Sequence, residues 1–292
     1  MHRWWLRAAI SALAVAALLA FVPLREVGAA VRDVNPLVWL ACLVVFVAGH
    51  ALNAAKLWLL LGRHIPMTAC LRAHFAGMAA NLGLPGVAGG EIVRVAYLAP
   101  SGGTARVTLA AIIDRIIDTV VLALIVVVAA QVAGLPPAVS GRLPSAGWTA
   151  VIATTAAVLA ALAWILLQRR WSTEAVASAS DGMRGRPGVM LVAATISGGV
   201  QIVFVLANVW LAHEAGALTD VGPWFLAWSA AKLGAVLPIS LGGIGVREAA
   251  LVAVLGAYGA SADAVLAAGF LWEGAIVAGS LGGFLTTQVF RR

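Results

Sequence analysis

The sequence predicts an all-α, polytopic helical membrane protein with about six spans plus two re-entrant helical hairpins, arranged as an inverted repeat. Three observations predict this fold. Of the 292 residues, 62% are hydrophobic and only 11% are charged, whereas a soluble domain has about 25% charged residues. The stretches 143–168 and 187–213 contain no Asp, Glu, Lys or Arg, and a spanning helix needs about 20 apolar residues. A motif rich in Pro and Gly also occurs twice.

Six segments are long and apolar enough to be predicted as spans, and several have tryptophans near their ends, as is typical of membrane interfaces. In chain order, the predicted spans are 4–24, 37–61, 106–133, 146–168, 189–213 and 262–289. The N-terminal segment contains Arg3 and Arg7 and is followed by an apolar run and by small residues near Gly28, so it also resembles a cleavable signal peptide. We expect an uncleaved anchor, because its removal would break the internal repeat.

Two apolar regions, 69–100 and 222–258, do not fit this scheme. A Pro and Gly cluster splits each region into two pieces of about 15 residues. A helix of that length is about 22 Å long, which is short of the ~30 Å hydrocarbon core. Each region is therefore predicted to be a re-entrant hairpin, and two short tilted spans are the alternative.

The two split regions share the pattern Leu-Pro-x-x-x-Gly-Gly-x-x-Val-Arg. The pattern ends at Arg94 in the first region and at Arg247 in the second, an offset of 153 residues. The same offset brings the spans on either side of the first region onto those around the second, to within about three residues. A chance coincidence of Pro and Gly is the alternative. The predicted helix breaks are Pro85, Gly89, Gly90, Pro238, Gly242 and Gly243.

This repeat predicts a single membrane domain, 1–292, built from halves at approximately 1–140 and 146–292. Each half contains three crossings and one hairpin. Because three is odd, the second half has the opposite orientation to the first, which is the inverted repeat found in many transporters.

The distribution of charge predicts the orientation of the chain. With both termini cytoplasmic, the inner segments contain eleven arginines and two acids, and the outer segments contain three arginines and five acids. This excess of positive charge on the cytoplasmic side is the usual bias of membrane proteins. We therefore expect a multi-pass protein of the bacterial inner membrane.

Ten ionisable side chains lie within apolar stretches. Charges at this depth cost several kcal/mol unless they are paired or hydrated, and they usually face the interior of the bundle. Structural pairing and a functional role are both open for each of them. The bases are Lys56, Arg94, Arg115, Lys232 and Arg247, and the acids are Glu91, Asp114, Asp118, Glu248 and Glu273.

Arg94 and Arg247 follow the two helix breaks. A break within the membrane frees backbone groups, and glycine lets the backbone approach a ligand closely. The helix that begins after each break would point its positive end at the break. This pattern predicts binding of an anionic group, above all phosphate, which arginine can bind through two nitrogens. Glu91 and Glu248 would hold these arginines when no ligand is bound, or engage a cationic headgroup.

The other candidates lie on neighbouring spans. Asp114 and Asp118 share a helix face and would accept Arg94 or Arg247, carry a proton or contact an amine. For Lys56 we expect the ammonium group to extend to the cytoplasmic interface. Lys232, ahead of the second break, is the better candidate for a site, and Glu273 has a similar depth in the last span. His50 and His74 are expected to be packing residues.

Several other functions are excluded. The net charge of +7 is not accompanied by a basic run with interleaved aromatic residues, so we expect no nucleic acid. Cys42 and Cys70 form no CxxC pair and no metal spacing, and are expected to be buried thiols. The sequence contains no GxSxG, P-loop or HExxH motif, so we expect no catalytic residue, metal or cofactor.

The segment 81–94, with Asp114-Arg115 and the segment 237–248, resembles the lysylphosphatidylglycerol synthase transmembrane family, whose flippase-like domain occurs in aminoacyl-phosphatidylglycerol synthases. The resemblance covers essentially the whole chain. It implies a protein like a lipid translocase. It does not imply lipid aminoacylation, because the family's separate soluble synthase domain does not occur in this sequence. The lipid substrate does not follow from the family.

These observations lead to a hypothesis of a lipid flippase or transporter that binds a phospholipid-like headgroup near Arg94 and Arg247. Two alternatives remain open. One is a membrane enzyme that acts on a lipid or a polyprenyl phosphate, and the other is an accessory subunit with partner proteins in a lipid, hopanoid or glycolipid pathway.

Overall fold

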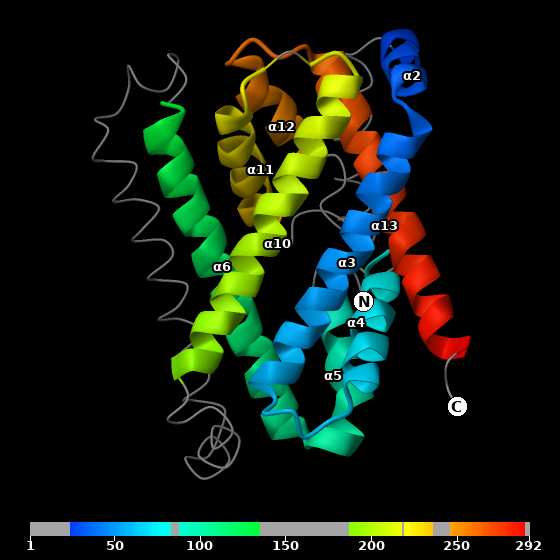
Figure 1. Ribbon diagram of the computed structural model, residues 1–292, viewed down its shortest axis with the longest axis vertical. Coiled ribbons are helices and arrows are strands. Elements are labelled where there is room, and N and C mark those ends of the chain that lie inside the picture. The colour runs from blue at the N-terminus through cyan, green and yellow to red at the C-terminus, as the bar shows by residue number, and fades with distance from the viewer. Residues whose placement is uncertain (1–23, 83–87, 135–186, 218, 236–245, 290–292) are drawn as a thin grey trace, which may run out of the picture.

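The computed structural model describes residues 24–82, 88–134, 187–217, 219–235 and 246–289 (Figure 1). Within these residues the chain forms helices and no strand, which confirms the predicted all-α fold. In chain order the helices are α2 (Leu24–Asp33), α3 (Pro36–Leu60), α4 (Met67–Asn81), α5 (Ala88–Gly102), α6 (Thr104–Val132), α10 (Pro187–Glu214), α11 (Val221–Ala235), α12 (Val246–Gly256) and α13 (Ala262–Val289).

The predicted spans 37–61, 106–133, 189–213 and 262–289 correspond to α3, α6, α10 and α13. Among the described helices, α3, α10 and α13 are long and apolar enough to cross a membrane. Helix α6 has 29 residues, or about 43 Å, but it carries three charged side chains near its middle. The predicted spans 4–24 and 146–168 fall almost entirely outside the described residues.

Helix α3 shows how the sequence sets the start of a span. The Asn35 side chain caps the helix, because its Oδ1 accepts a hydrogen bond from the Leu37 amide at 2.9 Å. Pro36 follows at the first helical position, where its fixed φ and missing N–H suit a helix start. The helix then runs for 25 residues.

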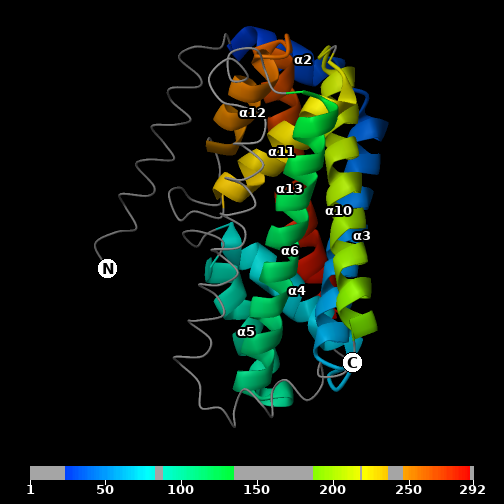
Figure 2. The same ribbon diagram turned by 90° about the vertical axis from the view of Figure 1, so that its left-hand side faces the viewer.

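The two regions predicted as hairpins each form a pair of short helices. Helices α4 and α5 have 15 residues each and pack together, and so do α11 and α12, with 15 and 11 residues. The first pair lies in the lower half of the molecule and the second in the upper half (Figures 1 and 2). The breaks at 83–87 and 236–245 lie outside the described residues, so re-entry into the same side stays a prediction.

Helix α2 was not predicted from the sequence, which placed this segment in a loop between spans. Its outward side carries Arg25, Arg32 and Asp33, which are exposed, while Ala30 is buried. The helix packs against α13 and lies at the upper end of both views (Figure 2). An amphipathic pattern of this kind places one face against protein and the other toward polar surroundings.

Apolar side chains cover the outside of the long helices. On α6 they recur every four residues as Val120, Leu124, Val128 and Val132, all exposed. Because residues four apart share a helix face, this face is a continuous apolar strip. Such a strip is suited to lipid rather than to water.

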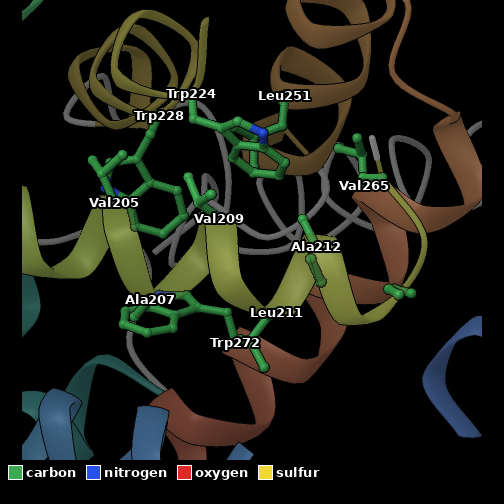
Figure 3. Close-up of a cluster of buried hydrophobic side chains, with 14 of the residues drawn as sticks. Val205, Ala207, Val209, Leu211, Ala212, Trp224, Trp228, Leu251, Val265 and Trp272 are labelled. Carbon is green, nitrogen blue, oxygen red and sulfur yellow. The ribbon is translucent and has the colours of Figure 1, made fainter. Parts of the chain in front are cut away.

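Three tryptophans lie in the described core (Figure 3). Trp224, Trp228 and Trp272 are at most 2% exposed, and the rings of Trp228 and Trp272 meet edge-to-face at 5.7 Å. They join α10, α11, α12 and α13 around one cluster. Cys42 and Cys70 are also buried, at 1% and 0% exposed, as expected from the sequence.

Three phenylalanine rings lie against glycines of neighbouring helices. A Cβ added to Gly49 of α3 would come within 2.5 Å of the Phe204 ring of α10. A Cβ on Gly279 of α13 would come equally close to the Phe46 ring of α3. Gly283 of α13 has the same relation to Phe75 of α4. These three glycine notches let α3, α4, α10 and α13 approach one another closely, as small residues do at helix interfaces in membranes.

Candidate functional site

The ten ionisable side chains predicted to lie at membrane depth are all described, and nine of them form two clusters. The first cluster comprises Lys56, Glu91, Arg94, Asp114, Arg115 and Asp118. The second cluster comprises Arg247, Glu248 and Glu273. Lys232 belongs to neither by direct contact. Counted over the described residues alone, the formal charges in the first cluster sum to zero, and those in the second sum to −1.

Arg94 is the buried centre of the first cluster, with 2% of its surface exposed. Its Nη2 contacts Glu91 Oε2 at 2.6 Å, on the same helix, and donates a hydrogen bond to Asp114 Oδ2 at 3.1 Å, on α6. The guanidinium group therefore ties the second helix of the first pair to the long helix that follows it.

Lys56 corrects one expectation. The sequence predicted that its ammonium group would extend to the membrane surface, but the residue is 0% exposed. Its Nζ lies 3.0 Å from Asp114 Oδ1 and also forms an ion pair with Asp118. The two carboxylates compensate the charge of this buried ammonium group, which would be costly without a partner, and the contacts join α3 to α6. The Ser197 hydroxyl of α10 also donates to Asp118, at 2.6 Å.

Arg115 lies at the open edge of the first cluster. Its side chain is 42% exposed, while Glu91 and Asp118 are 25% and 16% exposed. Its nitrogens lie 3.1 Å from Glu91, 3.5 Å from Asp114 and 3.7 Å from Asp118. All three acids of the cluster thus face at least two cations, and access to them is from the side of Arg115.

Arg247 is the centre of the second cluster. Its Nη2 donates to Glu248 Oε1 at 2.6 Å and to Glu273 Oε1 at 2.7 Å. Its guanidinium carbon lies 5.4 Å from the centre of the Trp228 ring, an arrangement that favours a cation. Arg247 joins α12 to α13, the long helix that follows it in the chain.

The two clusters are built on the same plan. In each, the arginine after the break uses one nitrogen, Nη2, for a glutamate of its own helix and for an acid of the next long helix. Other nitrogens remain unused, because Nε and Nη1 of Arg94 and Nε of Arg247 are buried with no hydrogen-bond partner among the described residues. Buried donors of this kind are rare and call for a partner.

Lys232 lies apart from both clusters, on α11. Its Nζ donates to Gln201 Oε1 of α10 at 2.9 Å and lies 5.8 Å from the centre of the Phe204 ring. No carboxylate of the described residues pairs with it directly. One turn earlier on α11, Trp228 Nε1 and Ser229 Oγ are buried and likewise lack a hydrogen-bond partner in the described part.

The predicted helix breaks are described only in part. Pro85, Pro238, Gly242 and Gly243 lie outside the described residues, and Gly89 lies in the first turn of α5.

Gly90, expected to admit a ligand, packs against α4 instead. Its amide donates to Asn81 Oδ1 at 2.6 Å, and a Cβ on Gly77 would lie 2.6 Å from the Gly90 carbonyl oxygen. This glycine therefore lets two backbones cross.

His50 and His74 are packing residues, as expected, but they also bond to each other. His50 Nδ1 and His74 Nε2 are 3.0 Å apart, and both rings pack among aromatic side chains. Sequence reasoning missed this pair and the roles of Ser197 and Gln201. The last two were detectable as isolated polar residues in a span free of charge. Among the described residues, no three or more His, Cys, Asp or Glu are grouped to hold a metal ion.

Comparison with known proteins gives one match. The family described as Lysylphosphatidylglycerol synthase TM region matches residues 4–282, as the motifs around Arg94 and Arg247 predicted. No curated protein and no solved structure matches the chain.

Proposed function

The chain belongs to the lysylphosphatidylglycerol synthase TM region family, and from this premise we propose that it is a lipid flippase or transporter of the bacterial inner membrane. It binds the anionic part of a phospholipid headgroup through Arg94 and Arg247. The family relates the chain to lipid modification or transport in a membrane. The charged clusters supply the reason to favour transport of a headgroup.

One observation carries the proposal. Arg94 and Arg247 hold their carboxylates through Nη2 alone, and each keeps at least one other nitrogen buried and unpartnered. A phosphate accepts hydrogen bonds from two nitrogens of one guanidinium group. An oxyanion at the unused edge of either arginine would therefore satisfy donors that are otherwise left without a partner.

The carboxylates around each arginine favour exchange over permanent binding. Glu91 and Asp114 neutralise Arg94 when no headgroup is bound, so the cluster is stable within the membrane. A headgroup phosphate competes for the same guanidinium group, and an amine on the headgroup would compensate the carboxylates. A transporter needs a site of this kind, because binding that is too strong would prevent release.

The positions of the two clusters support movement of a headgroup from one side of the membrane to the other. One arginine follows the first pair of short helices and the other follows the second pair, and the pairs lie in opposite halves of the molecule (Figure 2). An inverted repeat would make one cluster the entry site and the other the exit site. The acyl chains would remain in lipid, along apolar faces such as the strip on α6.

The proposal is tested with a fluorescent phosphatidylglycerol in proteoliposomes, where a reagent added outside bleaches only the outer leaflet. We compare the wild type with Arg94→Ala, Arg247→Ala and the double variant. A matched control is Arg32→Ala, which removes an exposed arginine of α2. Loss of one hydrogen bond from a charged group costs about 1.5–3 kcal/mol. Each single variant should therefore slow lipid movement by about 10- to 100-fold.

The expected result is movement at the rate of protein-free vesicles for the double variant and at the wild-type rate for the control. Size-exclusion chromatography and circular dichroism establish that each variant is folded. Wild-type movement by a folded double variant would refute the assignment of the site. Mass spectrometry of the recovered lipid tests the alternative of a membrane enzyme, since a covalently changed lipid would favour catalysis.

A further inference from the structure

A line of polar contacts leads from the first cluster to Lys232. It starts at Asp118, which accepts a hydrogen bond from the Ser197 hydroxyl of α10 at 2.6 Å. Gln201 follows four residues after Ser197, and residues four apart share a helix face. The Oε1 atom of Gln201 accepts a hydrogen bond from Lys232 Nζ of α11 at 2.9 Å. One face of α10 therefore connects the first cluster to Lys232.

The line continues along α11 to the second cluster. Trp228 lies four residues before Lys232, on the same face of the helix. The centre of its ring lies 5.4 Å from the guanidinium carbon of Arg247. Four residues of a helix span about 6 Å, so about one turn of α10 and one turn of α11 lie between the contacts of the two clusters and Lys232. Lys232 is thus a cation between Arg94 and Arg247.

From this arrangement we propose that Lys232 and Gln201 form a third binding site, which holds the phosphate of a net-anionic headgroup as it passes between Arg94 and Arg247. The Lys232 ammonium group binds the phosphate oxygens, and the Gln201 amide binds a hydroxyl group of the headgroup. This inference deepens the proposed function and rests on it for the movement of lipid. Binding at Lys232 can be measured without lipid movement.

The surroundings of Lys232 favour an anion as its further partner. The residue is half-buried, and its ammonium group contacts a neutral amide and the Phe204 ring, whose centre is 5.8 Å away. A ring and an amide compensate a cation within a membrane only in part. The break after α11, residues 236–245, contains no Asp or Glu in the sequence. A phosphate supplies the negative charge that these contacts lack.

Lys232 would hold a headgroup less firmly than the two arginines do. An ammonium group is a point charge on a flexible stem, so it can follow a moving phosphate, whereas a guanidinium group binds it through a fixed pair of donors. Sites that bind weakly and lie in series let an ion leave one site as it enters the next, as in ion channels. An intermediate site of this kind would shorten the distance that a phosphate crosses without a cation beside it.

The first experiment uses the chemistry of the lysine itself. Lys56 and Lys232 are the two lysines of the chain, and Lys56 is 0% exposed. A membrane-permeant acetylating reagent should therefore modify Lys232 in preference. The acetylation of each lysine is followed by mass spectrometry of the full chain in phosphatidylcholine nanodiscs and in nanodiscs that contain phosphatidylglycerol. Arg32→Lys provides an exposed control amine on α2, which reports any effect of anionic lipid on the reagent itself.

Phosphatidylglycerol should slow the acetylation of Lys232 relative to the control amine, by about tenfold when the lipid is at about ten times its Kd. Inorganic phosphate in phosphatidylcholine nanodiscs should protect Lys232 much less. Equal rates in the two lipids overturn the inference, and so does protection by inorganic phosphate as strong as that by phosphatidylglycerol. A Lys232 that is as unreactive as Lys56 also overturns it, because the site would then be closed to a headgroup.

The second experiment uses Gln201→Glu, which keeps the size of the side chain. The variant places a carboxylate within hydrogen-bond distance of Lys232. Because this carboxylate pairs with the ammonium group, the protein should stay folded while the phosphate is excluded. Acetylation of Lys232 should then no longer depend on phosphatidylglycerol. A lipid-dependent rate that persists in Gln201→Glu overturns the shared site.

The third experiment measures lipid movement in proteoliposomes over a range of phosphatidylglycerol contents. The maximal rate of Lys232→Met should fall by about tenfold or more, as expected for the loss of one interaction with a charged group. The lipid content at half-maximal rate should stay that of the wild type, because both arginines are intact, and Lys232→Arg should recover most of the rate. Wild-type maximal rates in Lys232→Met and Gln201→Glu overturn the intermediate site.

The experiments separate this inference from the proposed function. Protection of Lys232 by phosphatidylglycerol without any lipid movement contradicts the flippase but leaves the third binding site in place. Lipid movement without protection of Lys232 contradicts the third site but leaves the flippase in place.

Discussion

Replacing Lys56 by methionine tests whether the first cluster is a buried, mutually neutralised network. Methionine keeps the length and most of the volume of the side chain but removes its charge. Lys56 is 0% exposed and contacts two carboxylates, Asp114 and Asp118. Its loss leaves three carboxylates with two arginines, and removing one member of a buried ion pair costs about 3–5 kcal/mol.

Lys232→Met is the matched control. It removes the same group from a half-buried position, and the partner left behind is the neutral amide of Gln201. The lost hydrogen bond is partly offset, because a half-buried charge disappears as well, so we expect a loss of about 1 kcal/mol or less. The two substitutions should then differ by at least about 2 kcal/mol, or about 30-fold in the unfolding equilibrium constant.

The assay is reversible unfolding in mixed micelles with increasing denaturing detergent, followed by tryptophan fluorescence. A second variant makes the reasoning sharper, since adding Asp118→Asn to Lys56→Met removes the surplus carboxylate and should recover part of the loss. Equal stability of Lys56→Met and Lys232→Met would refute the network, as would a double variant no more stable than Lys56→Met alone.

Three further predictions concern packing and reactivity. Gly77→Ala should destabilise the protein by about 1–3 kcal/mol, because its Cβ would lie 2.6 Å from the Gly90 carbonyl oxygen. The control is Gly198→Ala, whose Cβ meets nothing closer than 3.8 Å. This control should be neutral or stabilising in the same unfolding assay. Cys42 and Cys70, which are buried, should react with a maleimide only after unfolding, as measured by mass spectrometry. Asp114→Asn should cost about 3–5 kcal/mol, since it leaves Lys56 and Arg94 with one carboxylate fewer.

The sequence predicted the long helices well. Apolar length is a strong signal, so α3, α6, α10 and α13 end within about two residues of the predicted spans. Charges in an apolar run are equally conspicuous, and all ten proved to be inside the protein or at the edge of a cluster. Membership of the family was also predicted correctly from the motifs around Arg94 and Arg247.

The partners of those charges could not be predicted, because pairing depends on distances between helices. Lys56 shows the difficulty. Its sequence neighbours give no sign of Asp118, which lies on another helix and binds it. Gly90 shows the same limit, since a glycine that admits a ligand and one that admits a backbone look alike in the sequence. Helix α2 was missed because ten residues with four charges resemble a loop.

The three glycine notches limit how the molecule can rearrange during a transport cycle. One turn along α3 from Gly49, the Phe204 ring would meet Val45 or Asn53 instead of a bare backbone. For α10 to slide along α3, the Phe204 ring would therefore have to lose its contact with Gly49 before any new contact forms. With Phe46 and Phe75 seated on α13 in the same way, α3, α4, α10 and α13 are expected to form a static frame. Helix α5 is tied to this frame by the backbone crossing at Gly77 and Gly90, and α6 by Lys56 and Ser197. Conformational exchange would then fall to α11 and α12, which carry Lys232, Arg247 and Glu248.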